Sequence, residues 1–166
     1  MIESHTPLSG SQIRTRCCIV GGGPAGLFLG YLLARAGVEV IVLEKHKDFL
    51  RDFRGDTIHP STLQLLFELG LLDEFLKIAD KHFESLNLNF EGQQIPGPYF
   101  THLPTECKFI TFAPQWDFLN MIASHACEYP NFHLHLQAEA KHLIRDGEHV
   151  IGVKVNGLEG DRKSVV

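Results

Sequence analysis

Short apolar runs alternate with glycine, proline and polar residues along this chain, and their order predicts a mixed α/β protein. Residues 16–20 are mostly apolar and predict a fully buried strand that ends at three glycines. Residues 24–36 place leucines along one helical face, with Pro24 in the first turn and Gly37 after the last. Residues 38–43 are rich in β-branched side chains and predict a second strand. Together these segments predict a βαβ unit with parallel strands and a right-handed crossover.

The remaining pattern adds helices and an antiparallel component. Helical spacing of apolar positions predicts further helices over 61–69, 73–79 and 115–128. Ser61 is the expected N-cap of the first of these, and Gly70 its stop signal. Alternating or short apolar segments predict strands over 85–90, 108–112, 132–136 and 150–155, with one more strand before the turn at Asp146 and Gly147. Residues 45–60 predict a surface loop, 91–92 a hairpin turn, and 96–98 an irregular connection.

Composition and charge exclude several classes of function. The 166 residues are 44% hydrophobic and 21% charged, which is ordinary for a globular protein. A formal net charge of -5 and the lack of a basic stripe argue against nucleic-acid binding. No apolar run approaches the ~20 residues of a membrane-spanning helix. Four cysteines without CxxC spacing predict no disulfide framework and a cytoplasmic location.

The segment Gly21–Gly26, GGGPAG, matches the G-x-G-x-x-G fingerprint of dinucleotide-binding loops. Gly21 permits a tight turn, Gly23 allows a pyrophosphate to approach the backbone, and Gly26 allows the helix to pack closely. The N–H groups and the positive dipole at the helix start favour phosphates. Glu44 follows Gly26 by 18 residues and is expected to accept hydrogen bonds from ribose hydroxyls. Its charge disfavours the 2′-phosphate of NADP, which leaves NAD and the ADP half of FAD.

Ten histidines raise the question of a metal centre. His133 and His135 share one face of a predicted strand, and His142 and His149 follow. No carboxylate or cysteine stands at a recognisable ligand spacing, so no metal site is expected.

A second group of residues favours FAD. Residues 51–60 read RDFRGDTIHP, and a leucine-rich helix ending in LGLL follows. Taken in order, the GGGPAG loop, the LEK at 43–45, the RGD..HP segment, the LGLL end and Pro114-Gln115 resemble the p-hydroxybenzoate hydroxylase-like family of FAD-dependent monooxygenases. The resemblance covers most of residues 15–155. It implies a Rossmann-like FAD-binding βαβ fold with an antiparallel β component.

The resemblance also assigns residues to the cofactor. The cofactor-binding residues that it implies are Gly21, Gly23, Pro24, Ala25, Gly26, Glu44, Lys45, Arg54 and Gln115. The loop residues would hold the FAD pyrophosphate, and Glu44 the adenosine ribose with Lys45 beside it. Arg54 would lie against the cofactor and Gln115 near the flavin, in keeping with the donors that arginine and glutamine offer. No side chain is assigned an acid or base role.

The activity implied is NAD(P)H-dependent hydroxylation of an aromatic or polyketide-like small molecule. Two alternatives stay open at this point: an NAD-linked dehydrogenase, and a truncated FAD-binding module without turnover. The oligomeric state is not readable from the sequence.

Two later fingerprints of the family, an Asp-Gly strand and a Gly-Asp segment near the ribityl chain, do not occur in the 166 residues. We therefore expect an incomplete, N-terminal part of the fold that is inactive alone. Residues 1–14 are expected to be a flexible terminus. Residues 15–160 are expected to form a partial FAD-binding domain that includes the start of a substrate-domain β region at 83–112. Residues 161–166, DRKSVV, match the translation of a common sequencing-adapter end and are expected to be non-native.

Overall fold

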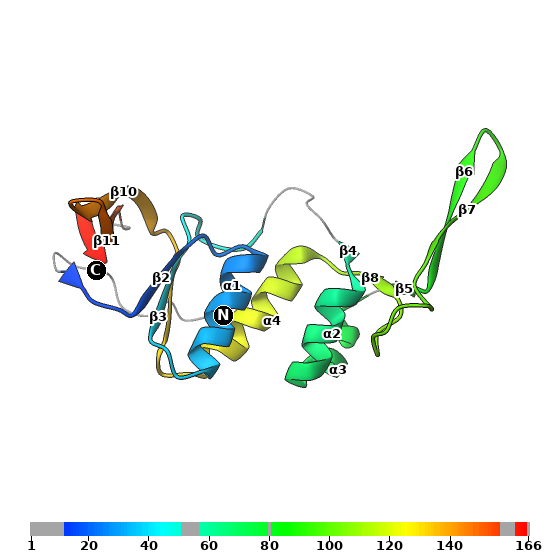
Figure 1. Ribbon diagram of the computed structural model, residues 1–166, viewed down its shortest axis with the longest axis horizontal. Helices are drawn as coiled ribbons and strands as arrows, with labels where there is room; N and C mark the ends of the chain where they lie inside the picture. The colour runs from blue at the N-terminus through cyan, green and yellow to red at the C-terminus, as the bar shows by residue number, and fades with distance from the viewer. Residues whose placement is uncertain (1–11, 51–56, 80, 157–161, 166) are drawn as a thin grey trace. The chain divides into compact units, whose positions relative to one another are not determined.

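The computed structural model describes residues 12–50, 57–79, 81–156 and 162–165 (Figure 1). Two compact units make up the chain, one of residues 1–50 with 119–166 and the other of residues 51–118. Residues 1–11 of the expected flexible terminus, and Arg54, lie outside the described residues.

Four helices and twelve strands are formed by the described residues. The helices are α1 (Pro24–Arg35), α2 (Pro60–Leu69), α3 (Leu72–Ile78) and α4 (Gln115–Cys127). The strands are β1 (Gln12–Ile13), β2 (Cys17–Val20), β3 (Val40–Leu43), β4 (Thr57–Ile58), β5 (Lys81–Phe83), β6 (Ser85–Phe90), β7 (Gln93–Tyr99), β8 (Ile110–Phe112), β9 (Phe132–His135), β10 (Glu139–Asp146), β11 (His149–Asn156) and β12 (Arg162–Val165). The expected mixed α/β fold is confirmed.

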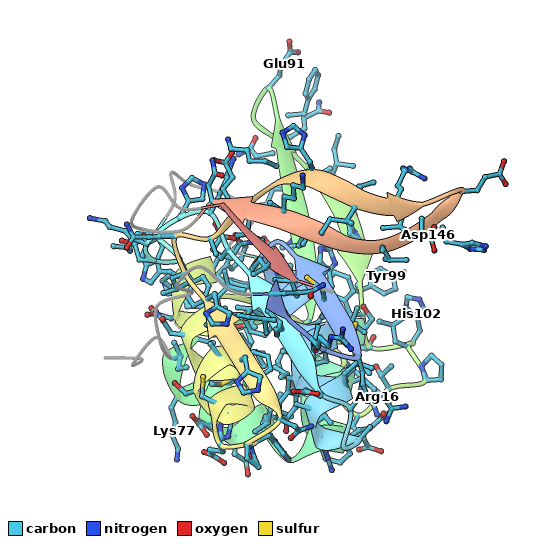
Figure 2. The ribbon with its side chains drawn as sticks, turned by 90° about the vertical axis from the view of Figure 1, so that its left-hand side faces the viewer. Arg16, Lys77, Glu91, Tyr99, His102 and Asp146 are labelled. Carbon is cyan, nitrogen blue, oxygen red and sulfur yellow. The ribbon has the colours of Figure 1, made fainter. Side chains whose placement is uncertain are left out.

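A parallel sheet of order β2-β3-β9 forms the centre of the first unit. Helix α1 connects β2 to β3, so the predicted parallel βαβ unit is confirmed. The α1 and α4 helices lie on one side of this sheet (Figures 1 and 2). All four residues of β3 are buried, because this strand has a neighbour on each side and a layer on each face. Strand β3 is therefore central within its sheet and also lies between the two layers that cover the sheet.

The second face of β3 packs against an antiparallel layer. Strands β10, β11 and β12 form a sheet that ends with β1, which pairs parallel to β12. Ile41 and Leu43 of β3 share one apolar cluster with Val153 and Val155 of β11. Residues 162–165, which fall within the segment expected to be non-native, form β12, and Val165 joins that cluster. The turn predicted after Asp146 is confirmed at the end of the β10–β11 hairpin (Figure 2).

The expectation that the first strand is fully buried is wrong. Val20 of β2 is 59% exposed, and Cys17, Cys18 and Ile19 are partly exposed. Strand β2 lies at the edge of its sheet, with β3 as its one partner among the described strands. An edge position leaves part of an apolar strand accessible even though its sequence is as hydrophobic as that of a central strand.

The unit of residues 51–118 contains α2, α3, a three-stranded antiparallel sheet of order β4-β8-β5 and the β6–β7 hairpin. Phe75 of α3 is fully buried and meets the ring of Phe118 edge-on at 5.7 Å. Gly70 ends α2 in a left-handed conformation with φ 75°, as predicted. Ser61 is not the N-cap, because α2 begins one residue earlier, at Pro60. Proline has no N–H to lose at a first helical position, and its fixed φ suits that position.

The β6–β7 hairpin extends further than the sequence pattern suggests. Glu91 (φ 48°) and Gly92 (φ 84°) form its turn, as predicted, and Glu91 stands at its tip (Figure 2). Residues 96–98 are part of strand β7 and not an irregular connection, so that expectation is wrong. Strand β7 pairs with β6 alone among the described strands, and the pairing shifts register between Ser85 and Asn87. Prolines are tolerated on such an open edge, where no N–H is needed.

Substitution of Gly30 tests how closely α1 approaches the parallel sheet. A Cβ atom at Gly30 would lie 2.8 Å from Val42 Cγ2 and 2.9 Å from Phe132 Cε2. We expect Gly30→Ala to lower the free energy of unfolding in urea by about 1–3 kcal/mol, because overpacking outweighs the better helix propensity of alanine. Leu29→Ala, at a neighbouring position that is 49% exposed, is the control and should change stability by about 0.5 kcal/mol or less. A Gly30→Ala chain that is more stable than the parent would contradict the tight packing.

Candidate functional site

The glycine-rich segment between β2 and α1 forms a tight turn that is fastened to β3. Gly21 has a φ of 111°, a value that favours glycine, and its N–H donates to the Leu43 carbonyl oxygen at 2.8 Å. Gly23 is the N-cap of α1 in an extended conformation. The Leu27 N–H donates to the Gly23 carbonyl oxygen at 2.9 Å, which is the first turn of the helix. The chain therefore passes from strand to helix within a few residues, as the fingerprint predicts.

The space around each glycine of the loop differs. A Cβ atom at Gly26 would lie 1.9 Å from the Gly21 carbonyl oxygen, so helix and turn approach as closely as backbones can. A Cβ atom at Gly22 would lie 2.9 Å from Glu44 Cβ. A Cβ atom at Gly23 would meet nothing within 4 Å. The loop is thus closed on its strand side and open at Gly23, where a ligand can approach the backbone.

The start of α1 supplies donors beside this open space. Pro24 occupies the first helical position and Ala25 follows it, both with exposed side chains. The first N–H groups of any α-helix have no acceptor within the helix, and the helix dipole adds positive potential there. With 12 residues, α1 is long enough for this effect. The combination of open backbone and free donors suits a phosphate group.

Glu44 lies against the glycine loop, next to the C-terminal end of β3. The residue is 7% exposed. Glu44 Oε2 accepts the Gly22 N–H at 2.9 Å, and Oε1 accepts the His46 N–H at 2.9 Å. Each carboxylate oxygen has a second lone pair, so the group can also accept ribose hydroxyls. The proximity of Glu44 to the loop was expected from spacing, but its two backbone contacts were not, since backbone donors leave no signature in residue types.

Of the other residues expected at the cofactor, the structure describes Lys45 and Gln115. Lys45 is exposed, directly after Glu44. Gln115 is the first residue of α4, is partly buried, and belongs to the unit of residues 51–118. The structure thus brings together the glycine loop and Glu44, and Arg54 falls outside the residues it describes.

Three thiols have raised pKa values, and the described histidines take part in no cluster of metal-ligating groups. Burial raises the pKa of the Cys18 thiol to about 11, with the neighbouring Cys17 adding to the rise. Burial also raises the pKa of the Cys107 and Cys127 thiols, which favours neutral thiols over nucleophilic thiolates. Within residues 12–50, 57–79, 81–156 and 162–165, no group of three metal-ligating side chains gathers. No helix in that described part is long and apolar enough to cross a membrane.

Comparison with known proteins identifies the family. A model of the FAD-binding domain family matches residues 14–166. This chain belongs to the FAD-binding domain family. FAD is accordingly the cofactor of the domain, and the geometry fits it: the loop is open at Gly23, closed at Gly26 and followed by a helix start.

Several curated relatives of this chain are monooxygenases. The 6-methylpretetramide 4-monooxygenase of Streptomyces rimosus is 28% identical over 143 residues, which cover 86% of this chain and 34% of the relative. The rifampicin monooxygenase of Rhodococcus hoagii is 34% identical over 110 residues, which cover 66% of this chain and 22% of the relative. The chain therefore spans 34% and 22% of the length of these two relatives.

A solved structure shows the same arrangement. The p-nitrophenol 4-monooxygenase of Pseudomonas putida superposes with a TM-score of 0.80 at 25% identity, covering 94% of this chain and 40% of that one. The match confirms the expected α/β FAD-binding fold.

Substitution of Gly26 tests the closed side of the loop without any cofactor. We expect Gly26→Ala to lower the free energy of unfolding by about 1–3 kcal/mol or more, because its Cβ atom would collide with backbone and not with a movable side chain. Urea unfolding of the FAD-free chain measures this. Gly23→Ala is the matched control, with open space around its Cβ atom, and should cost about 1 kcal/mol or less. Equal stability of the two variants would contradict the close approach of the backbones at Gly26.

Proposed function

We propose that this domain holds FAD for a monooxygenase that hydroxylates an aromatic or polyketide-like small molecule at the expense of NAD(P)H. The observation that carries the cofactor site is the open backbone at Gly23 beside the donors of α1. Bound FAD would supply the redox chemistry with dioxygen. The residues of this chain bind and orient the adenine half of the cofactor.

Each expected residue has a role in this proposal. The backbone from Gly21 to Gly26 surrounds the pyrophosphate, and Glu44 receives the adenosine ribose, supported by its position against the loop. We assign Lys45 to the same end of the cofactor. Arg54 and Gln115 are assigned to the cofactor and the flavin side on the family resemblance.

The substrate class rests on the relatives. Their names specify 6-methylpretetramide, rifampicin and p-nitrophenol. We extend the shared class to this protein, together with NAD(P)H as the reductant and a cytoplasmic location. The negative charge of Glu44 disfavours NADP at the glycine loop, so the reductant would be oxidised elsewhere in the protein.

Binding of FAD by the 166-residue chain is tested by titration followed through quenching of flavin fluorescence. We expect saturable binding of FAD, and a Gly23→Ala chain that binds at least about tenfold more weakly, because its methyl group would occupy the open space at the backbone. Leu29→Ala, at a 49% exposed position of α1 outside the glycine loop, is the control for a substitution away from the site. Saturable binding of NAD without binding of FAD would favour the NAD-linked dehydrogenase and overturn the proposal.

Turnover is tested separately from binding. Because the 166-residue chain spans 34% or less of the length of the first curated relatives, we expect it to bind FAD without oxidising NADPH. The protein as its gene encodes it should oxidise NADPH with p-nitrophenol or a polycyclic polyketide present, and mass spectrometry should find one oxygen atom from labelled dioxygen in the product. NADPH oxidation without a hydroxylated product from any such compound would contradict the proposed substrate class.

A further inference from the structure

Glu44 engages every polar group that it carries. Its N–H donates to the His135 carbonyl oxygen at 2.9 Å, and its carbonyl oxygen accepts the Ala138 N–H at 2.8 Å. Its two carboxylate oxygens accept the N–H groups of Gly22 and His46, each at 2.9 Å. One buried residue thereby joins the glycine loop, the end of β3 and the turn that follows β9.

The backbone of Glu44 is anchored independently of the glycine loop. Gln137, between β9 and β10, has a φ of 56°, which is uncommon for a residue other than glycine. Its N–H donates to the His46 carbonyl oxygen at 2.9 Å, next to the bond from Ala138 to Glu44. The segment from Glu44 to His46 is therefore fixed from the β9–β10 side, and its carboxylate offers the loop a fixed acceptor.

The loop is bound to this anchor through two successive N–H groups. Gly21 donates to the carbonyl oxygen of Leu43 at 2.8 Å, and Gly22 donates to the carboxylate of Glu44 at 2.9 Å. Both amides point to β3 and its continuation, so the open space remains at the next residue, Gly23. Without the second bond, the Gly22 peptide would lose its fixed orientation, since glycine accepts many backbone conformations.

A carboxylate is the group that this arrangement requires. Two N–H donors approach two different oxygens of one side chain. A glutamine side chain has one oxygen and one NH₂ group, so it can accept from one of the donors while its NH₂ group faces the other. Glu44→Gln keeps the shape of the side chain and breaks one of the two contacts.

We infer that Glu44 is a positioning residue that holds the glycine loop in its phosphate-binding shape before a cofactor arrives, in addition to any contact with ribose. The inference extends the proposed function at the same site, and its readout in the cofactor-free chain does not depend on FAD. It separates two consequences of one carboxylate: the shape of the loop and recognition of the sugar.

The first experiment measures amide hydrogen exchange by NMR in the FAD-free, 166-residue chain. We expect protected amides at Gly22 and His46, and at least a tenfold loss of protection at one or both in Glu44→Gln. Glu39→Gln makes the same chemical change at an exposed position just before β3 and should leave both amides protected. If Glu44→Gln does not fold, the parent chain still decides: Gly22 exchanging as fast as an unstructured peptide overturns the inference. Unchanged protection in a folded Glu44→Gln chain also overturns it.

The second experiment separates loop positioning from ribose recognition. The parent chain and Glu44→Gln are titrated with FAD and with an FAD analogue whose adenosine ribose lacks both hydroxyls. Positioning predicts that Glu44→Gln weakens both ligands by about tenfold or more. A loss confined to FAD would show that Glu44 acts on the ribose alone and would overturn the inference. If the parent chain binds neither ligand while its Gly22 amide is protected as expected, the proposed function fails and the positioning role stands.

Discussion

The hydrogen bond from the Gly21 N–H to the Leu43 carbonyl oxygen is the contact on which the site depends. It connects the end of β2 to the end of β3 at the point where the chain turns into α1. Gly26 can then approach the Gly21 carbonyl oxygen so closely that no side chain fits between them. This approach fixes where the helix begins and therefore where its free N–H groups lie. The adjacent contact of Gly22 with Glu44 continues the same row of bonds by one residue.

Local features of the sequence predicted the βαβ unit and the glycine loop, because strand, turn and helix signals there are set by neighbouring residues. The turn at Gly21 and the end of α2 at Gly70, both with a positive φ, were predictable for the same reason. Long-range features were not. The exposure of Val20 depends on which strands flank β2 in space, and the inclusion of residues 96–98 in β7 depends on an open edge. The bond from Gly22 to Glu44 joins residues 22 positions apart through a backbone donor that every residue type but proline possesses.

Family membership adds what the geometry of a loop leaves open. A phosphate-binding turn with an acidic partner suits both FAD and NAD, and the match to the FAD-binding domain family over residues 14–166 decides for FAD. Because this chain spans 22–34% of the length of the first relatives, the match by itself does not carry their substrates over to it. We propose that the glycine loop and Glu44 serve the cofactor.

The alternation of side chains along β3 has a consequence for how the domain can evolve. Val42 faces the helix layer through Gly30, whereas Ile41 and Leu43 face the antiparallel layer. A substitution on one face can be compensated within the layer that it touches and leaves the other layer undisturbed. The two layers are therefore free to diverge in sequence at different rates. What both must conserve is the course of the β3 backbone, which carries the carbonyl and the carboxylate that hold the loop.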